Sequence, residues 1–249
     1  MRAFKALFKI ESRLSLRGLD MFIFAIGMPI VVVIIIGAIF GNKPAYDGAT
    51  HTFLEQSFGA ISTIAICAGG VMGFPLVIAD YRTRKILKRF KVTPISPTLI
   101  LTVQLTIYAL YAIVSLLLVY ATASIFYGYQ FQGSWIVFIG AYFLVMASMF
   151  SMGLLVGGLA PHMKIAGVIA SLLYFPMLIF SGATLPYEVM PATLQKAADL
   201  LPLTQGIKML KGASLGLGMS AESTIVPVIV MLALAVACVS LSLRYFKWE

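Results

Sequence analysis

The clearest pattern along the chain is a series of six long apolar windows separated by short polar segments. Each window has about the 20 apolar residues that a helix needs to cross a bilayer, and none contains Asp, Glu, Lys, Arg or His. The windows cover residues 21–40, 58–79, 98–124, 134–158, 165–182 and 224–243. This pattern predicts an all-α integral membrane protein with six transmembrane helices.

Composition supports this prediction, because 61% of the 249 residues are hydrophobic and only 11% are charged. A soluble domain carries about 25% charged residues, so this chain has too few of them to cover a surface that faces water. We expect one membrane domain over residues 1–249. Cys67 and Cys238 fall inside apolar windows and are interpreted as small packing residues, not as a disulfide or a metal site.

The basic residues orient the six windows. Fourteen of the 18 Lys and Arg residues fall in the two terminal segments and in the loops after the second and fourth windows, and four fall in the other loops. The positive-inside rule therefore predicts that both termini lie in the cytoplasm. This orientation explains the net charge of +9, so we expect the lipid bilayer, and no nucleic acid, as the partner of the basic segments.

Residues 1–20 have the pattern of an amphipathic helix that lies in the membrane interface. Four basic residues recur at every fourth position, and an apolar face interrupted by Glu11 fills most of the opposite side. This helix either serves only to orient the chain or also contacts a partner on the cytoplasmic side. The sequence leaves both interpretations open.

A second basic segment, residues 80–91, separates the second and third windows. Its pattern predicts a short helix parallel to the membrane, with Asp80 at its start and an apolar face of Ile86, Leu87 and Phe90. Two prolines that follow prevent this helix from continuing into the third window. The compact apolar face favours a docking surface for a cytoplasmic protein; the alternative is a basic loop that only enforces topology.

The longest loop on the external side covers residues 183–223. Its apolar pieces are too short to span a bilayer, and Pro186, Pro191 and Pro202 each mark a helix start or a chain reversal. We expect short re-entrant helices that dip into the outer leaflet. The alternative is a folded external cap with no role in transport.

Two Gly-x-x-x-Gly motifs lie inside the windows, one at Gly69 and Gly73 and the other at Gly153 and Gly157. Small residues at this spacing let two helix backbones approach closely. Such motifs serve either packing within one chain or contact between two copies, and the sequence leaves both open.

The chain lacks the chemistry of an enzyme or of an ion-coupled transporter. No window holds an ionisable residue that would bind a proton or a cation, and the two histidines, His51 and His162, lie in loops. Neither a catalytic constellation nor a metal site can be drawn. The sequence also has no Gly-x-x-x-x-Gly-Lys-Ser/Thr loop for nucleotide phosphates. We therefore expect a chain that is not itself an enzyme and that needs another polypeptide for any ATP-driven work.

These features, in this order, resemble the permease subunit of type-2 ABC transporters over the whole chain. The most specific likeness lies in Leu87-Lys-Arg-Phe-Lys-Val-Thr-Pro-Ile-Ser96, Phe180-Ser-Gly-Ala-Thr-Leu-Pro186 and Leu201-Pro-Leu-Thr-Gln205. The resemblance implies the fold of that family's exporters, with an amphipathic N-terminal helix, six spans, a cytoplasmic coupling helix and broken external helices before the last span. The family often places a second acid and a glycine early in the coupling helix, where this chain reads Tyr81-Arg-Thr-Arg-Lys85.

The resemblance also implies a mechanism. Two permease copies, identical or related, form the pathway, and two separate ATP-binding cassette ATPase subunits bind ATP and Mg beneath them. The ATPases push on the coupling helix, and the residues that the resemblance assigns to this contact are Asp80, Tyr81, Arg82, Arg84, Ile86, Leu87, Arg89 and Phe90. It assigns the external segment and gate to Pro186, Pro191 and Pro202.

We therefore expect the membrane subunit of an ABC exporter in the bacterial cytoplasmic membrane. Its passenger would be amphipathic or lipid-like, such as a drug or an antibiotic, and the same machinery exporting a lipid-linked polysaccharide is the alternative. An ATP-independent secondary transporter is disfavoured, because the sequence offers no site for a coupling ion.

Overall fold

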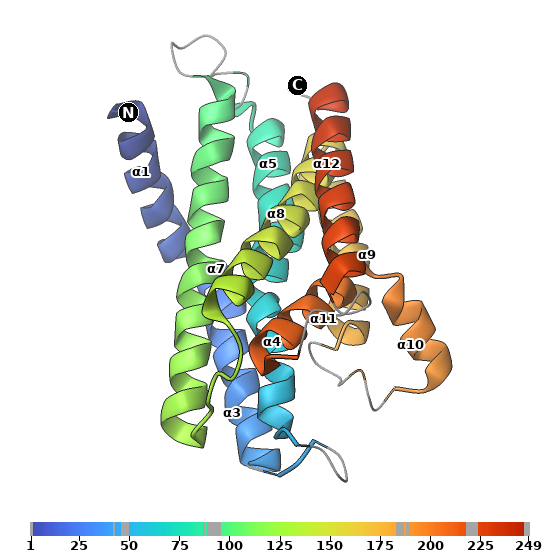
Figure 1. The fold of residues 1–249 in the computed structure, drawn as a ribbon. Helices are drawn as coiled ribbons and strands as arrows, with labels where there is room; N and C mark the ends of the chain where they lie inside the picture. The colour runs from blue at the N-terminus through green and yellow to red at the C-terminus, as the bar shows by residue number, and fades with distance from the viewer. Residues whose placement is uncertain are drawn as a thin grey trace.

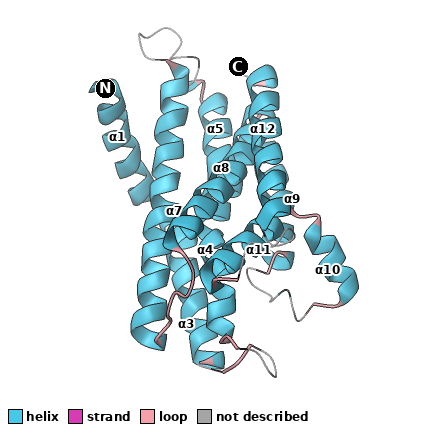
Figure 2. Cartoon of the chain, viewed as in Figure 1, coloured by secondary structure: helices cyan, strands magenta, loops and turns pink. Residues whose placement is uncertain are grey.

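The computed structural model of the chain describes residues 2–41, 43–45, 50–86, 88, 96–182, 187, 190–217 and 224–246. These residues form helices joined by loops, and the β-type pairing among them is a single isolated bridge between Pro44 and Thr52 (Figure 2). The fold is all-α, as predicted.

Six helical stretches are long and apolar enough to cross a membrane, which confirms the predicted spans (Figure 1). The first consists of η1 (Ile23–Gly27) and α3 (Met28–Phe40), and follows α1 (Arg2–Gly18) and α2 (Asp20–Phe22). The second consists of α4 (Phe53–Cys67), η2 (Ala68–Gly73) and α5 (Phe74–Thr83). The other four are α7 (Pro97–Tyr127), α8 (Trp135–Leu159), α9 (Met163–Phe180) and α12 (Val226–Tyr245).

The second span begins at Phe53, earlier than the apolar window predicts, because a capping box precedes it. The Thr52 hydroxyl accepts a bond from the Glu55 backbone N–H (3.2 Å), and the Thr52 N–H donates to Glu55 Oε2 (2.7 Å). Both bonds satisfy N–H groups that have no partner inside the helix. The window missed this first turn because its residues include polar ones.

The first two spans each contain a π-helical turn close to a proline. The turn η1 ends two residues before Pro29, and η2 ends two residues before Pro75. A proline ring displaces the carbonyl of the preceding turn and offers no N–H, and the wider π turn accommodates both effects.

The second span forms the centre of the bundle. Its apolar window is 83% buried, compared with 22–61% in the other five spans. It packs against α8 on one side and against α3 and α7 on others.

Glycines make the contact between the second span and α8 possible. A Cβ atom at Gly153 would meet the carbonyl oxygen of Gly70, and one at Gly157 would meet Ile78. On the other side of the span, Gly69 and Gly73 face the side chain of Tyr108 on α7. Both Gly-x-x-x-Gly motifs therefore serve packing within the chain.

The two ends of the chain lie at the same end of the bundle (Figure 1). The end of α5 and the start of α7 are at this end too, whereas the ends of α3 and α7 are at the opposite end. An even number of crossings requires this arrangement. The assignment of this end to the cytoplasm stays a prediction.

The helix α1 descends beside the first half of α7 (Figure 1). Its basic residues Lys5, Lys9, Arg13 and Arg17 are exposed, and its other face contributes Phe4, Leu7 and Phe8 to the packing against the core. The predicted amphipathic helix is therefore present, and its orientation in a bilayer stays a prediction.

The prediction that Asp80 begins a separate helix is wrong. The helix α5 continues to Thr83, so Asp80, Tyr81 and Arg82 belong to the last turn of the second span. The chain leaves the helix at Arg84 and Lys85, where Lys85 has a φ of 58°. The prediction failed because Asp80 marks the end of the apolar window, whereas the helix itself continues to Thr83.

Candidate functional site

A cluster of three polar side chains joins the end of α5 to α1 and α7. The Tyr81 hydroxyl donates to Oε2 of Glu11 on α1 (2.6 Å). The amide Nε2 of Gln104 on α7 donates to the same carboxylate oxygen (2.8 Å) and to the Tyr81 hydroxyl (2.8 Å). All three side chains are buried or half-buried, which strengthens these bonds relative to exposed ones. These bonds therefore tie the end of α5 to both α1 and α7.

The neighbouring Arg82 joins α5 to α8. Its side chain is buried, with only 6% of the residue exposed, and its guanidinium donates to the carbonyl oxygens of Gly157 (2.9 Å), Gly158 (3.1 Å) and Ala160. The ring of Phe246, just after α12, lies 5.6 Å from the guanidinium carbon. The last carbonyls of a helix lack partners within it and carry partial negative charge, so a cation is well placed there. Arg82 therefore does not present its side chain to a cytoplasmic partner, contrary to the sequence assignment.

The remaining residues assigned to the contact lie at or beyond the end of α5. Arg84 is exposed, and its Nε donates to Oδ1 of Asp80 (2.9 Å). Ile86 is half-buried. Leu87, Arg89 and Phe90 lie outside the described residues, so their roles stay predictions.

A cavity of about 380 Å³ opens between α1, α5 and α7 at this end of the bundle. Its polar lining includes Glu11, Asp80, Arg84 and Gln104, and Ile86 is among its apolar residues. Residues after α5 and residues of α1 therefore face the same cavity. We call the cavity and the two sets of bonds around Tyr81 and Arg82 the coupling end.

At the opposite part of the molecule, two short helices precede the last span. They are α10 (Ala192–Asp199) and α11 (Pro202–Leu215). Pro191 directly precedes α10 and Pro202 is the first residue of α11, so both prolines mark helix starts as predicted. Pro186 lies outside the described residues.

The helix α11 lies inside the bundle. It packs against α4, α8 and α12, and Figure 1 shows it set back from the lower ends of α3 and α7. Close contacts fix it, because a Cβ at Gly206 would meet Val145 and Met231, and one at Gly59 would meet the backbone of Leu210 and Lys211. The segment before the last span is therefore embedded between the other spans.

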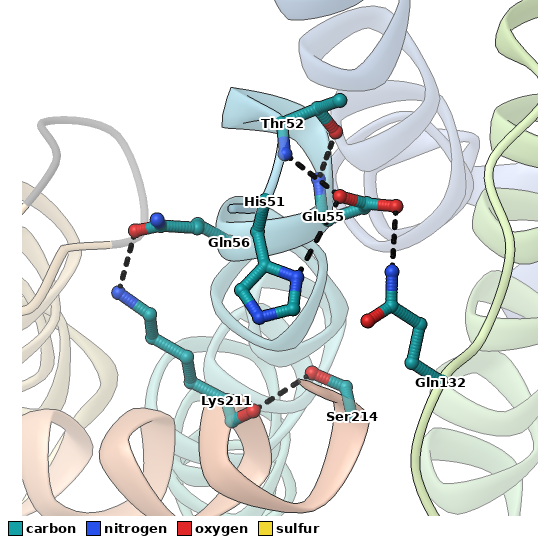
Figure 3. A network of polar contacts seen from close by, with 7 residues as sticks. All are labelled: His51, Thr52, Glu55, Gln56, Gln132, Lys211 and Ser214. Carbon is teal, nitrogen blue, oxygen red and sulfur yellow. Dashed lines mark hydrogen bonds and ion pairs between the residues drawn. The ribbon is translucent and has the colours of Figure 1, made fainter. Parts of the chain in front are cut away.

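A polar network ties α11 to the start of α4 and to the loop before α8 (Figure 3). Lys211 Nζ donates to Oε1 of Gln56 (2.9 Å), and Gln132 Nε2 donates to Oε1 of Glu55 (3.1 Å). The Gln132 backbone N–H donates to the carbonyl of Ser214 (3.3 Å). Two of these bonds, those of Lys211 and Ser214, hold α11 itself.

A second polar contact holds α10 against α11. Lys208 Nζ lies 2.7 Å from Oδ1 of Asp199, and the Tyr187 hydroxyl donates to both oxygens of the same carboxylate (2.9 and 3.0 Å). Burial alone would lower the pKa of Lys208, but the hydrogen bond and charge of Asp199 outweigh it and raise that pKa. Burial and the bond to Asp199 also raise the pKa of Tyr187. At neutral pH the ammonium and the phenol therefore both keep their protons.

An apolar groove runs between α7, α8 and α12. It consists of two adjoining cavities of about 250 and 430 Å³, and both are lined by Leu105 and Leu154. Phe143 and Phe150 line one part, and Phe246 lines the other. No lining residue of either cavity is ionisable, so the groove suits an apolar group.

A comparison with protein families matches residues 2–215 to the family described as ABC-2 type transporter. The match covers well over half of the chain. The chain belongs to the ABC-2 type transporter family. A comparison with curated proteins found no match.

The matched part of this ABC-2 transporter chain contains the coupling end and the external segment, and it ends at the last residue of α11. The helix α12 follows the match and completes the bundle by packing against α8 and α11. The chain is therefore a membrane component of an ABC-2 transporter, with six spans.

Two residues of the coupling end of this ABC-2 chain, Glu11 and Gln104, were not among the predicted site residues. Both carried a usable signal: Glu11 is the single acid on the apolar face of α1, and Gln104 is the single amide inside an otherwise apolar span. A lone polar group on such a face needs a partner, because leaving it unpaired in an apolar environment is costly. The identity of each partner is not readable from the sequence.

Proposed function

We propose that this chain is the membrane-spanning subunit of an ATP-driven exporter in a bacterial cytoplasmic membrane, with both termini in the cytoplasm. With a second permease copy it forms the pathway for an amphipathic or lipid-like passenger such as a drug or an antibiotic. ATP and Mg bind to separate ATPase subunits. The observation that carries this proposal is the family match across five of the six spans.

The proposed ATPase contact is the segment that begins at Asp80. Of the residues assigned to it from the sequence, the proposal keeps Asp80, Arg84, Ile86, Leu87, Arg89 and Phe90. Tyr81 and Arg82 act behind this surface, because their bonds to α1, α7 and α8 convert a push on the segment into movement of three helices. Desolvated apolar anchors contribute more to such a contact than exposed charges do.

The proposed passenger class rests on the apolar groove between α7, α8 and α12. A groove without ionisable lining residues favours an apolar or amphipathic molecule over a charged one, because a charge there would lose its hydration without gaining a partner. Amphipathic drugs are expected to stimulate the ATPase activity of the assembled complex. Stimulation by lipid-linked polysaccharide alone would assign the chain to the alternative passenger.

The coupling proposal is tested by Leu87→Asp, which places a charge on the docking surface. We expect the variant to insert normally and to lose the co-purifying ATPase, measured as the stoichiometry of the two subunits after detergent extraction. Leu217→Asp is the matched control, because Leu217 is an exposed leucine after α11, away from the coupling end. Normal assembly of Leu87→Asp, or a wild-type chain that transports without any ATPase, would overturn the proposal.

A further inference from the structure

A second groove, separate from the one between α7, α8 and α12, lies between α1 and α7. It has a volume of about 310 Å³. Phe8, Ser12 and Leu16 form its wall on α1, and Ile107, Leu110 and Val114 are on α7. Leu16, Leu110 and Val114 are 40–55% exposed. The groove therefore opens outward between the two helices.

The groove is apolar and rigidly framed. The helix α7 carries no charged residue along its whole length. The Ser15 and Tyr111 hydroxyls are 3.0 Å apart and bond α1 to α7 beside the groove. Phe22, in the short helix after α1, also lines it. An acyl chain here would gain van der Waals contacts with apolar side chains of both helices.

A row of basic residues borders this groove. Lys9, Arg13 and Arg17 each follow a groove residue by one position, which places them about 100° further around α1. Lys5 lies about 60° from Phe8 on the same side. All four side chains are exposed. The side of the groove that α1 forms is therefore strongly positive, and the side that α7 forms is uncharged.

Glu11, the acid of α1, does not neutralise these basic residues. Glu11 points toward α5 and α7, where it accepts bonds from Tyr81 and Gln104. By helix geometry it lies at least 120° away from Lys5 and further from Lys9 and Arg13. The positive charge of these basic residues is thus available to a bound anion.

We propose that the groove between α1 and α7 binds an anionic phospholipid. One acyl chain occupies the apolar groove, and the phosphate lies against Lys9 and Arg13. The complementarity of charge selects an anionic headgroup, and the groove distinguishes this site from a merely basic surface, which would attract anionic lipids without holding a chain. Because α1 shares the Glu11–Tyr81–Gln104 cluster with α5, lipid at this site would also hold the coupling end in place.

The test uses the full chain purified in detergent and titrated with phosphatidylglycerol or with phosphatidylcholine of the same acyl chains. Native mass spectrometry measures the lipid retained. We expect preferential retention of phosphatidylglycerol, and a loss of about thirtyfold in its affinity in the double variant Lys9→Gln, Arg13→Gln, since each basic residue near an anionic headgroup contributes a factor of about five. The matched control, Lys164→Gln with Arg244→Gln, removes two exposed charges from the start of α9 and the end of α12 and should retain the lipid.

A second variant, Leu110→Trp, tests the groove itself. The indole would fill the space for the acyl chain, so retention of phosphatidylglycerol should fall although all basic residues remain. Equal retention of the two lipids by the wild type, equal losses in the two double variants, or full retention by Leu110→Trp would each overturn the proposal. Conversion of a wild-type dimer to a monomer by Leu110→Trp would instead assign the groove to a second copy of the chain.

Discussion

At the scale of single residues, Arg82 has a different role in the structure from the surface role that the sequence predicts. Arg82 stands among six Lys and Arg residues within residues 80–91, and its position in that basic run suggests a solvated cation. In the structure it enters the bundle and satisfies three carbonyl groups at the end of α8. The packing of α8 holds these carbonyls in place, and Arg82 therefore links the end of α5 to the end of α8.

Replacing Arg82 should lower the stability of the folded chain. In Arg82→Met the carbonyls of Gly157, Gly158 and Ala160 lose a charged donor, so we expect a loss of about 2–4 kcal/mol in the free energy of unfolding. A thermal melt of the purified chain measures it as a lower Tm. Arg84→Met is the control, since Arg84 is exposed and pairs only with Asp80 among the contacts described for it. Equal melting temperatures for the two variants would contradict the role given to Arg82.

At the scale of elements, the bundle is organised by the close contact between the second span and α8. Backbone approaches backbone at Gly70 and Gly153, which large residues would prevent. This contact also positions the end of α8 where Arg82 can reach it. The helix pair and the arginine therefore stabilise one another.

The contact predicts a sharp difference between two glycines of α8. Gly153→Leu forces a side chain into the Gly70 carbonyl, and we expect it to cost about 3 kcal/mol or more and to abolish a monodisperse peak in size-exclusion chromatography. Gly140→Leu should behave as the wild type, because a Cβ at Gly140 meets nothing within 4 Å. Indistinguishable elution of the two variants would show that the contact between η2 and α8 can relax.

The elements differ in how well the sequence predicted them. The six spans, the amphipathic α1 and the helix starts at Pro191 and Pro202 follow from apolar length, periodicity and proline chemistry, which are local properties. The predicted second span is too short at both of its ends. Glu55 and Asp80 interrupt the apolar pattern there, but they do not interrupt the helix. The partners of Glu11, Arg82 and Lys211 come from helices far away in the chain, and no local pattern specifies them.

At the scale of the whole molecule, the bundle has two unlike ends. One holds both termini and the coupling end, and the other holds the loops after α3 and α7, with α11 inserted between the spans above it. The two ends are connected by the second span, which begins in the network of Figure 3 and finishes at Tyr81 and Arg82. In the proposed mechanism, this helical path carries a push from the coupling end to α11.

The orientation of these ends can be measured with single cysteines in a background of Cys67→Ala and Cys238→Ala. We expect Lys43→Cys and Leu217→Cys to react with a membrane-impermeant maleimide in intact cells, because the positive-inside rule places their end outside. Arg84→Cys and Lys164→Cys should react only after lysis. All four positions are exposed, so a lack of labelling would reflect sidedness. The reverse pattern would place both termini outside.

The π-helical turn η2 has a consequence for how the length of the chain can vary among its relatives. A π turn holds about one residue more than an α turn, so removing one residue between Ala68 and Gly73 would restore the ordinary turn and leave Tyr81 and Arg82 facing α1 and α8. A deletion inside α5 has no such turn to absorb it, and it would rotate Tyr81 and Arg82 by about 100° away from their partners. Among homologous chains, single-residue differences in the length of the second span should therefore fall in η2 and not in α5.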